Sequence, residues 1–92
     1  MRYDEFELTD SAYRHGFNDE DFAEMLRRRH LLLRSRRGKW VGYEIFGRNR
    51  KGEYLLAAGR IVQSTGVTRF RVFHLNRMSP AERRRFQREV NP

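Results

Sequence analysis

The sequence contains no cysteine, which excludes disulfide bonds and thiolate metal sites. Lysine is nearly as scarce, because only Lys39 and Lys51 accompany the 18 arginines. No apolar run approaches the roughly 18 residues of a membrane-spanning helix, and the first residues lack the apolar stretch of a signal peptide. Metal-ligand spacings, glycine-rich phosphate loops and nucleophile elbows are also absent. We therefore expect a cytoplasmic protein that uses no metal and no small-molecule cofactor and does not bind a membrane.

The chain is short and strongly basic. Its 92 residues predict one domain, spanning 1–92, with one modest core. The formal net charge of +8 is unevenly distributed, because residues 1–24 carry net −6 and residues 25–92 carry net +14. Guanidinium groups bind phosphate through paired hydrogen bonds and stack on bases, so RNA is the favoured partner. The acidic segment could shield the basic surface, in which case deleting residues 1–8 should tighten RNA binding.

The apolar pattern predicts an α+β domain with an N-terminal strand, two short helices, a four-strand antiparallel meander and a C-terminal helix. The sharpest local signal is Ser79-Pro80-Ala81-Glu82, a capping box that starts the last helix at Pro80 and directs Phe86 and Val90 inward. The expected elements are a strand over 3–8, a helix ending at His15 before Gly16, a helix capped by Asn18 that buries Phe22, Met25 and Leu26, strands over 31–34, 40–46, 54–62 and 67–76, and a helix over 80–90.

Histidines and arginines are the candidate catalytic residues. RNA cleavage without a metal needs a base for the 2′-hydroxyl, an acid for the leaving oxygen, and cations that stabilise the phosphorane. His15, at a helix end, and His74, near the end of the last strand, are the candidate proton-transfer groups. Arg71 and Arg77 are the candidate phosphate-stabilising cations. In the structural alternative, His74 makes its hydrogen bonds inside the core, His15 interacts only with the end of its helix, and the arginines are merely solvated.

Strand alternation separates these candidates in the last predicted strand. One face carries Phe70, Val72 and His74, and the other carries Arg69, Arg71 and Phe73. A single catalytic cluster therefore requires a bulge or a strand end that turns a side chain over.

Further arginines are candidate RNA contacts. Two basic turns are expected, at 36–39 and at 47–52, with Trp40 in the core between them. The candidate nucleic-acid-binding residues are Arg69, Arg83, Arg84, Arg48 and Arg50.

Several segments together resemble BrnT-type toxins of type II toxin–antitoxin systems, which belong to the RelE-like ribonuclease toxins. The segments are Arg14-His15-Gly16 before an acidic helix, Ile45-Phe46-Gly47 with the Gly52 turn, and Arg71-Val72-Phe73 followed by Glu82-Arg83-Arg84-Arg85-Phe86. The likeness covers nearly the whole chain. It implies a RelE-like fold, ribonuclease toxicity that stops translation, and a neutralising antitoxin protein, which can also bind DNA, as partner.

The chain departs from that family pattern at three places. Glu53 stands where the family usually has Arg, and Phe86 replaces the usual tyrosine of the terminal helix. His74-Leu75-Asn76-Arg77 replaces the Ser-Ala-Arg end of the last strand. Two alternatives to a toxin endoribonuclease therefore stay open: a non-catalytic basic RNA- or DNA-binding module, including a degenerate toxin, and an adaptor whose basic face meets an acidic protein.

Overall fold

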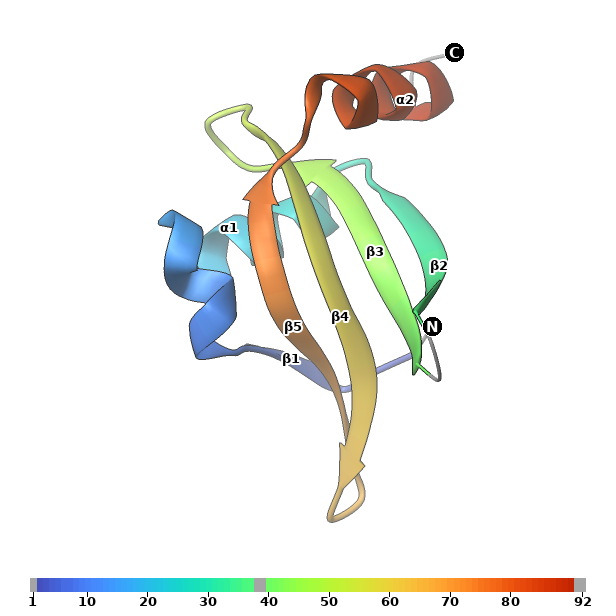
Figure 1. The fold of residues 1–92 in the computed structure, drawn as a ribbon. Helices are drawn as coiled ribbons and strands as arrows, with labels where there is room; N and C mark the ends of the chain where they lie inside the picture. Colours follow the sequence, from blue (N-terminus) through green and yellow to red (C-terminus); the bar gives the residue numbers. More distant parts are fainter. Residues whose placement is uncertain (1, 38–39, 91–92) are drawn as a thin grey trace.

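The computed structural model describes residues 2–37 and 40–90, with the backbone alone for 35–37 and 40–41. Its elements follow the predicted α+β order (Figure 1). They are β1 (Glu5–Leu8), the 3-10 helix η1 (Asp10–His15), α1 (Asp19–Arg27), β2 (Leu31–Arg37), β3 (Trp40–Arg48), β4 (Tyr54–Ser64), β5 (Val67–Arg77) and α2 (Pro80–Val90).

The five strands form one mixed sheet in the order β1-β5-β4-β3-β2. Strands β2 to β5 make the predicted antiparallel meander, and β1 joins its edge parallel to β5. Strand β2 is longer than expected, so Arg36 and Arg37 belong to the strand and not to a turn. The rest of that predicted turn, 38–39, and the side chain of Trp40 lie outside the described residues.

The main core lies between one face of the sheet, which we call the inner face, and the segment η1–α1. Helix α1 begins with a capping box in which Asn18 and Asp21 exchange side-chain and backbone hydrogen bonds, as the sequence predicts. Its Phe22 and Met25 are fully buried. The buried cluster comprises Ala12, Phe17, Phe22, Met25, Ile45, Leu55, Ala57, Phe70, Val72 and Leu75.

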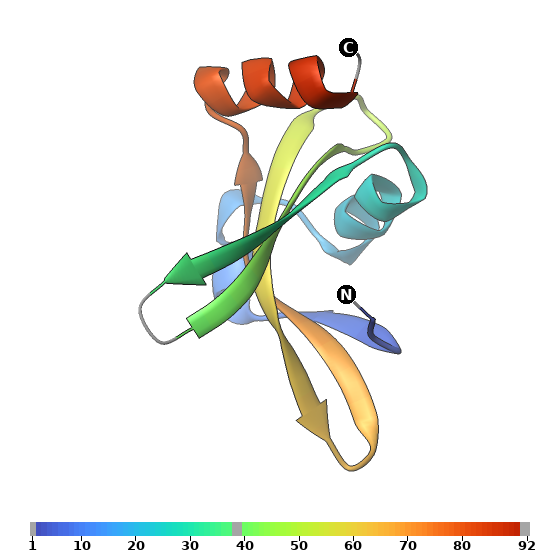
Figure 2. The same cartoon turned by 90° about the vertical axis from the view of Figure 1, so that its right-hand side faces the viewer.

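Helix α2 covers one end of the opposite, outer face of the sheet (Figure 2). The Ser79 backbone N–H donates to Glu82 at 2.7 Å, and the Glu82 N–H donates to Ser79 Oγ, which confirms the predicted capping box. Phe86 is buried in a second cluster with Phe46 and Leu56, and Val90 packs at its edge. Because α2 reaches only this end, the rest of the outer face is available to carry a site.

Candidate active site

A β-bulge interrupts the pairing of β4 with β5. Ala58 pairs with His74, whereas the next residue, Gly59, pairs with Val72. Phe73 is therefore an extra residue in β5, opposite no residue of β4. The bulge decides which side chains of β5 share a face.

The bulge reverses the alternation predicted for the end of β5. Phe70 and Val72 are buried on the inner face, as expected, but His74 lines a hollow on the outer face. The outer face also carries Arg69 and Arg71, since their β1 partners flank the inward-facing Phe6. The expectation that His74 lies with Phe70 and Val72, away from the arginines, is therefore wrong, because one extra residue shifts the period-two pattern.

Gly59 allows the backbones of β4 and β5 to approach closely at the bulge. A Cβ atom at this position would lie 2.3 Å from the carbonyl oxygen of Arg71 and 3.0 Å from the Phe70 ring. Only glycine fits there without moving the strand. The close approach therefore lies beside the bulge after which His74 occupies the outer face.

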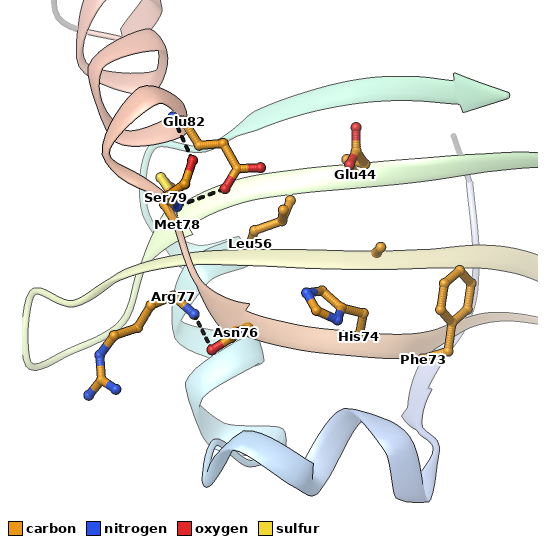
Figure 3. Close-up of a pocket in the computed structure, with 10 residues that line it drawn as sticks. Glu44, Leu56, Phe73, His74, Asn76, Arg77, Met78, Ser79 and Glu82 are labelled. Carbon is orange, nitrogen blue, oxygen red and sulfur yellow. Dashed lines mark hydrogen bonds between the residues drawn. The ribbon is translucent and has the colours of Figure 1, made fainter. Parts of the chain in front are cut away.

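Glu44, Ala58 and His74 form a row across three neighbouring strands of the outer face. Ala58 of β4 pairs with Glu44 of β3 on one side and with His74 of β5 on the other. The small alanine is the floor between two longer polar side chains, in a hollow of about 600 Å³ (Figure 3). The hollow is lined by Glu44, Leu56, Ala58, Phe73, His74, Asn76, Arg77, Met78, Ser79 and Glu82.

The row places a carboxylate opposite an imidazole at a spacing suited to a phosphodiester. Strands are about 5 Å apart, so the Glu44 and His74 backbones are separated by about 10 Å. Both side chains can then reach a group that rests over Ala58. None of the ion pairs among the described side chains engages the Glu44 carboxylate.

Arginines occupy the next rows of the same face. Arg60 of β4 pairs in register with Arg71 of β5, two residues along β4 from Ala58. The Arg71 Nε donates to Glu7 at 2.6 Å, and Arg69 is paired in the same way with Glu5. Positive charge therefore lies beside the hollow, and part of it is neutralised by β1.

His15 also approaches this site, as the sequence interpretation required. The rings of His15 and His74 meet edge to face, with centroids 5.8 Å apart. A hydrogen bond links helix η1 to the bulge, because the Ser11 hydroxyl donates to the Phe73 carbonyl oxygen at 2.7 Å. Of the four candidate catalytic residues, the structure brings His15 and His74 together, and it places Arg71 on the same face but outside the lining of the hollow.

Arg77, the fourth candidate, directs its guanidinium away from the hollow (Figure 3). Its Nη2 donates to Glu53 at 2.7 Å, and its Cζ lies 5.2 Å from the Phe17 ring centroid. Glu53 also accepts a hydrogen bond from the side chain of Asn49. These bonds, from Asn49 first and then from Arg77, lower the pKa of the Glu53 carboxyl below its ordinary value of 4.5. Arg77 is positioned as part of this network and not as a partner of His74.

The other candidate RNA-binding arginines divide into two groups. The guanidiniums of Arg48 and Arg83 lie over the ring of Tyr54, with Cζ atoms 4.7 and 4.1 Å from its centroid. Arg50, in the β3–β4 turn, binds the Glu24 carboxylate through its backbone N–H, and its side chain is exposed. Arg84 is exposed on α2. Only the first pair forms a cluster.

Glu44 and Arg60 were not among the predicted site residues. Both occupy outward positions of strands, where a charged residue is ordinarily solvated, so nothing in the local sequence distinguishes them. The one signal in the sequence was the small residue Ala58. Once the register of the hairpins is known, strand alternation places Glu44 and His74 on either side of it.

No known family model matches the chain, and a search of curated proteins found none similar to it. No described helix is long and apolar enough to cross a membrane. The resemblance to BrnT-type toxins therefore continues to depend on the motifs quoted above.

Proposed function

We propose that this chain is a toxin-type endoribonuclease that cleaves RNA by transesterification at the 2′-hydroxyl. The observation that supports this most directly is the row Glu44–Ala58–His74, which places a carboxylate and an imidazole on opposite sides of a shallow floor. The described side chains supply a base, an acid and neighbouring cations, which are the groups that this reaction requires.

In this mechanism Glu44 acts as the base and His74 as the acid. A carboxylate is ionised at neutral pH and accepts the proton of the 2′-hydroxyl, and O2′ attacks the adjacent phosphorus. The P–O5′ bond breaks, and the protonated imidazole of His74 donates its proton to O5′. The products are a 2′,3′-cyclic phosphate and a 5′-hydroxyl. Arg60 and Arg71 lie in the next row, where they can stabilise the negative charge of the phosphorane.

Phe73 supports recognition of single-stranded RNA. It lines the same hollow and is 36% exposed. An unpaired base can stack on such a ring, whereas a base inside a duplex cannot.

Two of the three departures from the BrnT pattern lie outside the Glu44–His74 row, and the third supplies His74 itself. Phe86 is buried on the side of α2 that packs on the sheet, and Glu53 is engaged by Asn49 and Arg77. We therefore prefer a catalytic protein to a non-catalytic binding module. As a toxin acting on translation it would work in the cytoplasm, with an antitoxin protein that can also bind DNA, encoded by a neighbouring gene.

The test is RNA cleavage by purified protein, compared between the wild type, Glu44→Gln and His74→Gln. Each substitution should lower the cleavage rate about 10²- to 10⁴-fold while the thermal unfolding curve stays that of a folded protein. Glu20→Gln and His30→Gln, which change exposed residues outside the hollow, are the matched controls.

The substrate provides a second check on the same proposal. RNA whose 2′-hydroxyl is replaced by hydrogen or O-methyl should resist cleavage, and the products of normal RNA should end in a 2′,3′-cyclic phosphate. Binding without cleavage products would favour the non-catalytic module, and cleavage that survives both Glu44→Gln and His74→Gln would overturn the assignment.

A further inference from the structure

A second hollow adjoins the candidate active site. It has a volume of about 310 Å³ and shares Arg77 and Met78 with the Glu44–His74 hollow. Its lining is Arg48, Gly52, Glu53, Tyr54, Arg77, Met78 and Arg83. The two hollows are therefore neighbours that meet at Arg77 and Met78, and a strand bound in one is directed past these residues toward the other.

Two cations of this second hollow stack on one aromatic ring. Arg48 comes from the end of β3 and Arg83 from the first turn of α2, and both guanidiniums lie within 5 Å of the Tyr54 ring centroid. A hydrogen bond from Gln87 and, after it, the charges of Arg48 and Arg83 lower the pKa of the Tyr54 hydroxyl from its ordinary value of 10.0. Stacking on a ring face leaves N–H groups at the edge of a guanidinium able to donate to a ligand, although the Gly52 carbonyl engages Arg48 Nε and the Tyr54 hydroxyl engages Arg83.

The turn after β3 is shaped to hold Arg48 in this position. Its Nε donates to the carbonyl oxygen of Gly52 at 3.1 Å. Gly52 has φ +83°, and a Cβ atom there would lie 2.8 Å from Arg48 Nη2. The positive φ favours glycine here, and the missing side chain leaves room for the Arg48 guanidinium beside the turn.

The charge of the cluster is not balanced by the protein. None of the ion pairs among the described residues involves Arg48 or Arg83, and the only acid of the lining, Glu53, is engaged by Arg77. Two arginines gathered on one ring, with no ion-pair partner among the described residues, form a positively charged site suited to an anion.

We propose that Arg48, Tyr54 and Arg83 form a phosphate-binding subsite for an RNA strand whose reacting phosphodiester lies between Glu44 and His74. The proposal rests on the proposed function for the direction of the strand. Tyr54 is four residues from Ala58 along β4, about 13 Å, so the subsite holds a phosphate beyond the one that reacts. It anchors the strand without reading its bases.

The experiment measures equilibrium binding of an uncleavable 2′-O-methyl RNA of about eight nucleotides, within the range of single-strand sites. Arg48→Gln/Arg83→Gln should weaken binding about 5- to 25-fold near 0.1 M salt and reduce the logarithmic salt slope by about 0.7 to 1.4, because one or two phosphate contacts are lost. Arg28→Gln/Arg88→Gln removes the same charge from exposed positions outside both hollows and should have a clearly smaller effect.

Two further arms separate the possible outcomes. A dinucleotide, which reaches only the first hollow, should bind the wild type and Arg48→Gln/Arg83→Gln equally. Arg48→Lys/Arg83→Lys should restore the salt slope but not the full affinity, because lysine neither stacks in the same way nor binds phosphate through two nitrogens. Equal weakening by the cluster pair and by the control pair would overturn the subsite. The assay needs no cleavage, so an inactive protein that shows these differences would refute the proposed reaction and keep the subsite.

Discussion

Strand β1 offers a direct test of whether acidic residues restrain RNA binding. Glu5 and Glu7 face Arg69 and Arg71 in register, and each carboxylate is paired with the guanidinium opposite it. The substitution Glu5→Gln/Glu7→Gln removes both carboxylates but keeps side chains of the same size. Phe6 still packs on the main core, so β1 should stay in place.

The expected gain in RNA affinity can be estimated from counterion release. Each phosphate bound on a single strand contributes a slope of about −0.7 in a plot of log affinity against log salt. Between 1 M and 0.1 M salt this is about 5-fold per contact, and about 25-fold if both freed arginines bind phosphate. The stability cost should be small, because these pairs are one third to one half exposed, and such pairs contribute about 0.2–1 kcal/mol each.

The assay is fluorescence anisotropy with labelled, uncleavable RNA between about 0.05 and 0.3 M salt. The matched control is Glu20→Gln/Glu89→Gln, which breaks two exposed ion pairs elsewhere and produces the same change in net charge. We expect the β1 variant to bind more tightly than this control and to show the steeper salt slope. Equal affinities for the two variants would show that Arg69 and Arg71 are not shielded and would refute the reasoning.

Two predictions concern stability. Gly59→Ala should destabilise the protein by about 3 kcal/mol or more and lower Tm by more than about 10 °C, because its Cβ would overlap the Arg71 carbonyl oxygen. The control Gly66→Ala adds backbone strain without a clash and should cost about 1–2 kcal/mol, so similar melting curves for the two variants would contradict the prediction. The pKa of the Glu53 carboxyl is lowered by Asn49 and Arg77, so this group should add stability that is complete above pH 4.5 and lost as the pH falls through its folded-state pKa. The free energies of unfolding of the wild type and Glu53→Gln, measured in urea, should therefore differ at neutral pH and converge in acid. A difference that does not change with pH would exclude this role.

Local signals in the sequence were sufficient for much of the fold. The capping box at Ser79 and Glu82 and the cap at Asn18 each depend on side chains three residues apart, so both helix starts could be predicted to the residue. The antiparallel meander followed from turn residues and alternation. The parallel pairing of β1 with β5 could not be predicted, because it joins segments more than 60 residues apart and no short motif specifies it.

The candidate site was harder to predict because it depends on one inserted residue. Regular alternation separates His74 from Arg69 and Arg71, and only the extra residue Phe73 places all three on one face. That bulge is stabilised by the close approach of Gly59 to the β5 backbone, and a glycine in a strand signals such an approach without saying which partner residue it meets. The position of His74 is thus a property of the pairing between two strands. A sequence search for catalytic residues in such a sheet has to consider both faces after every strand glycine.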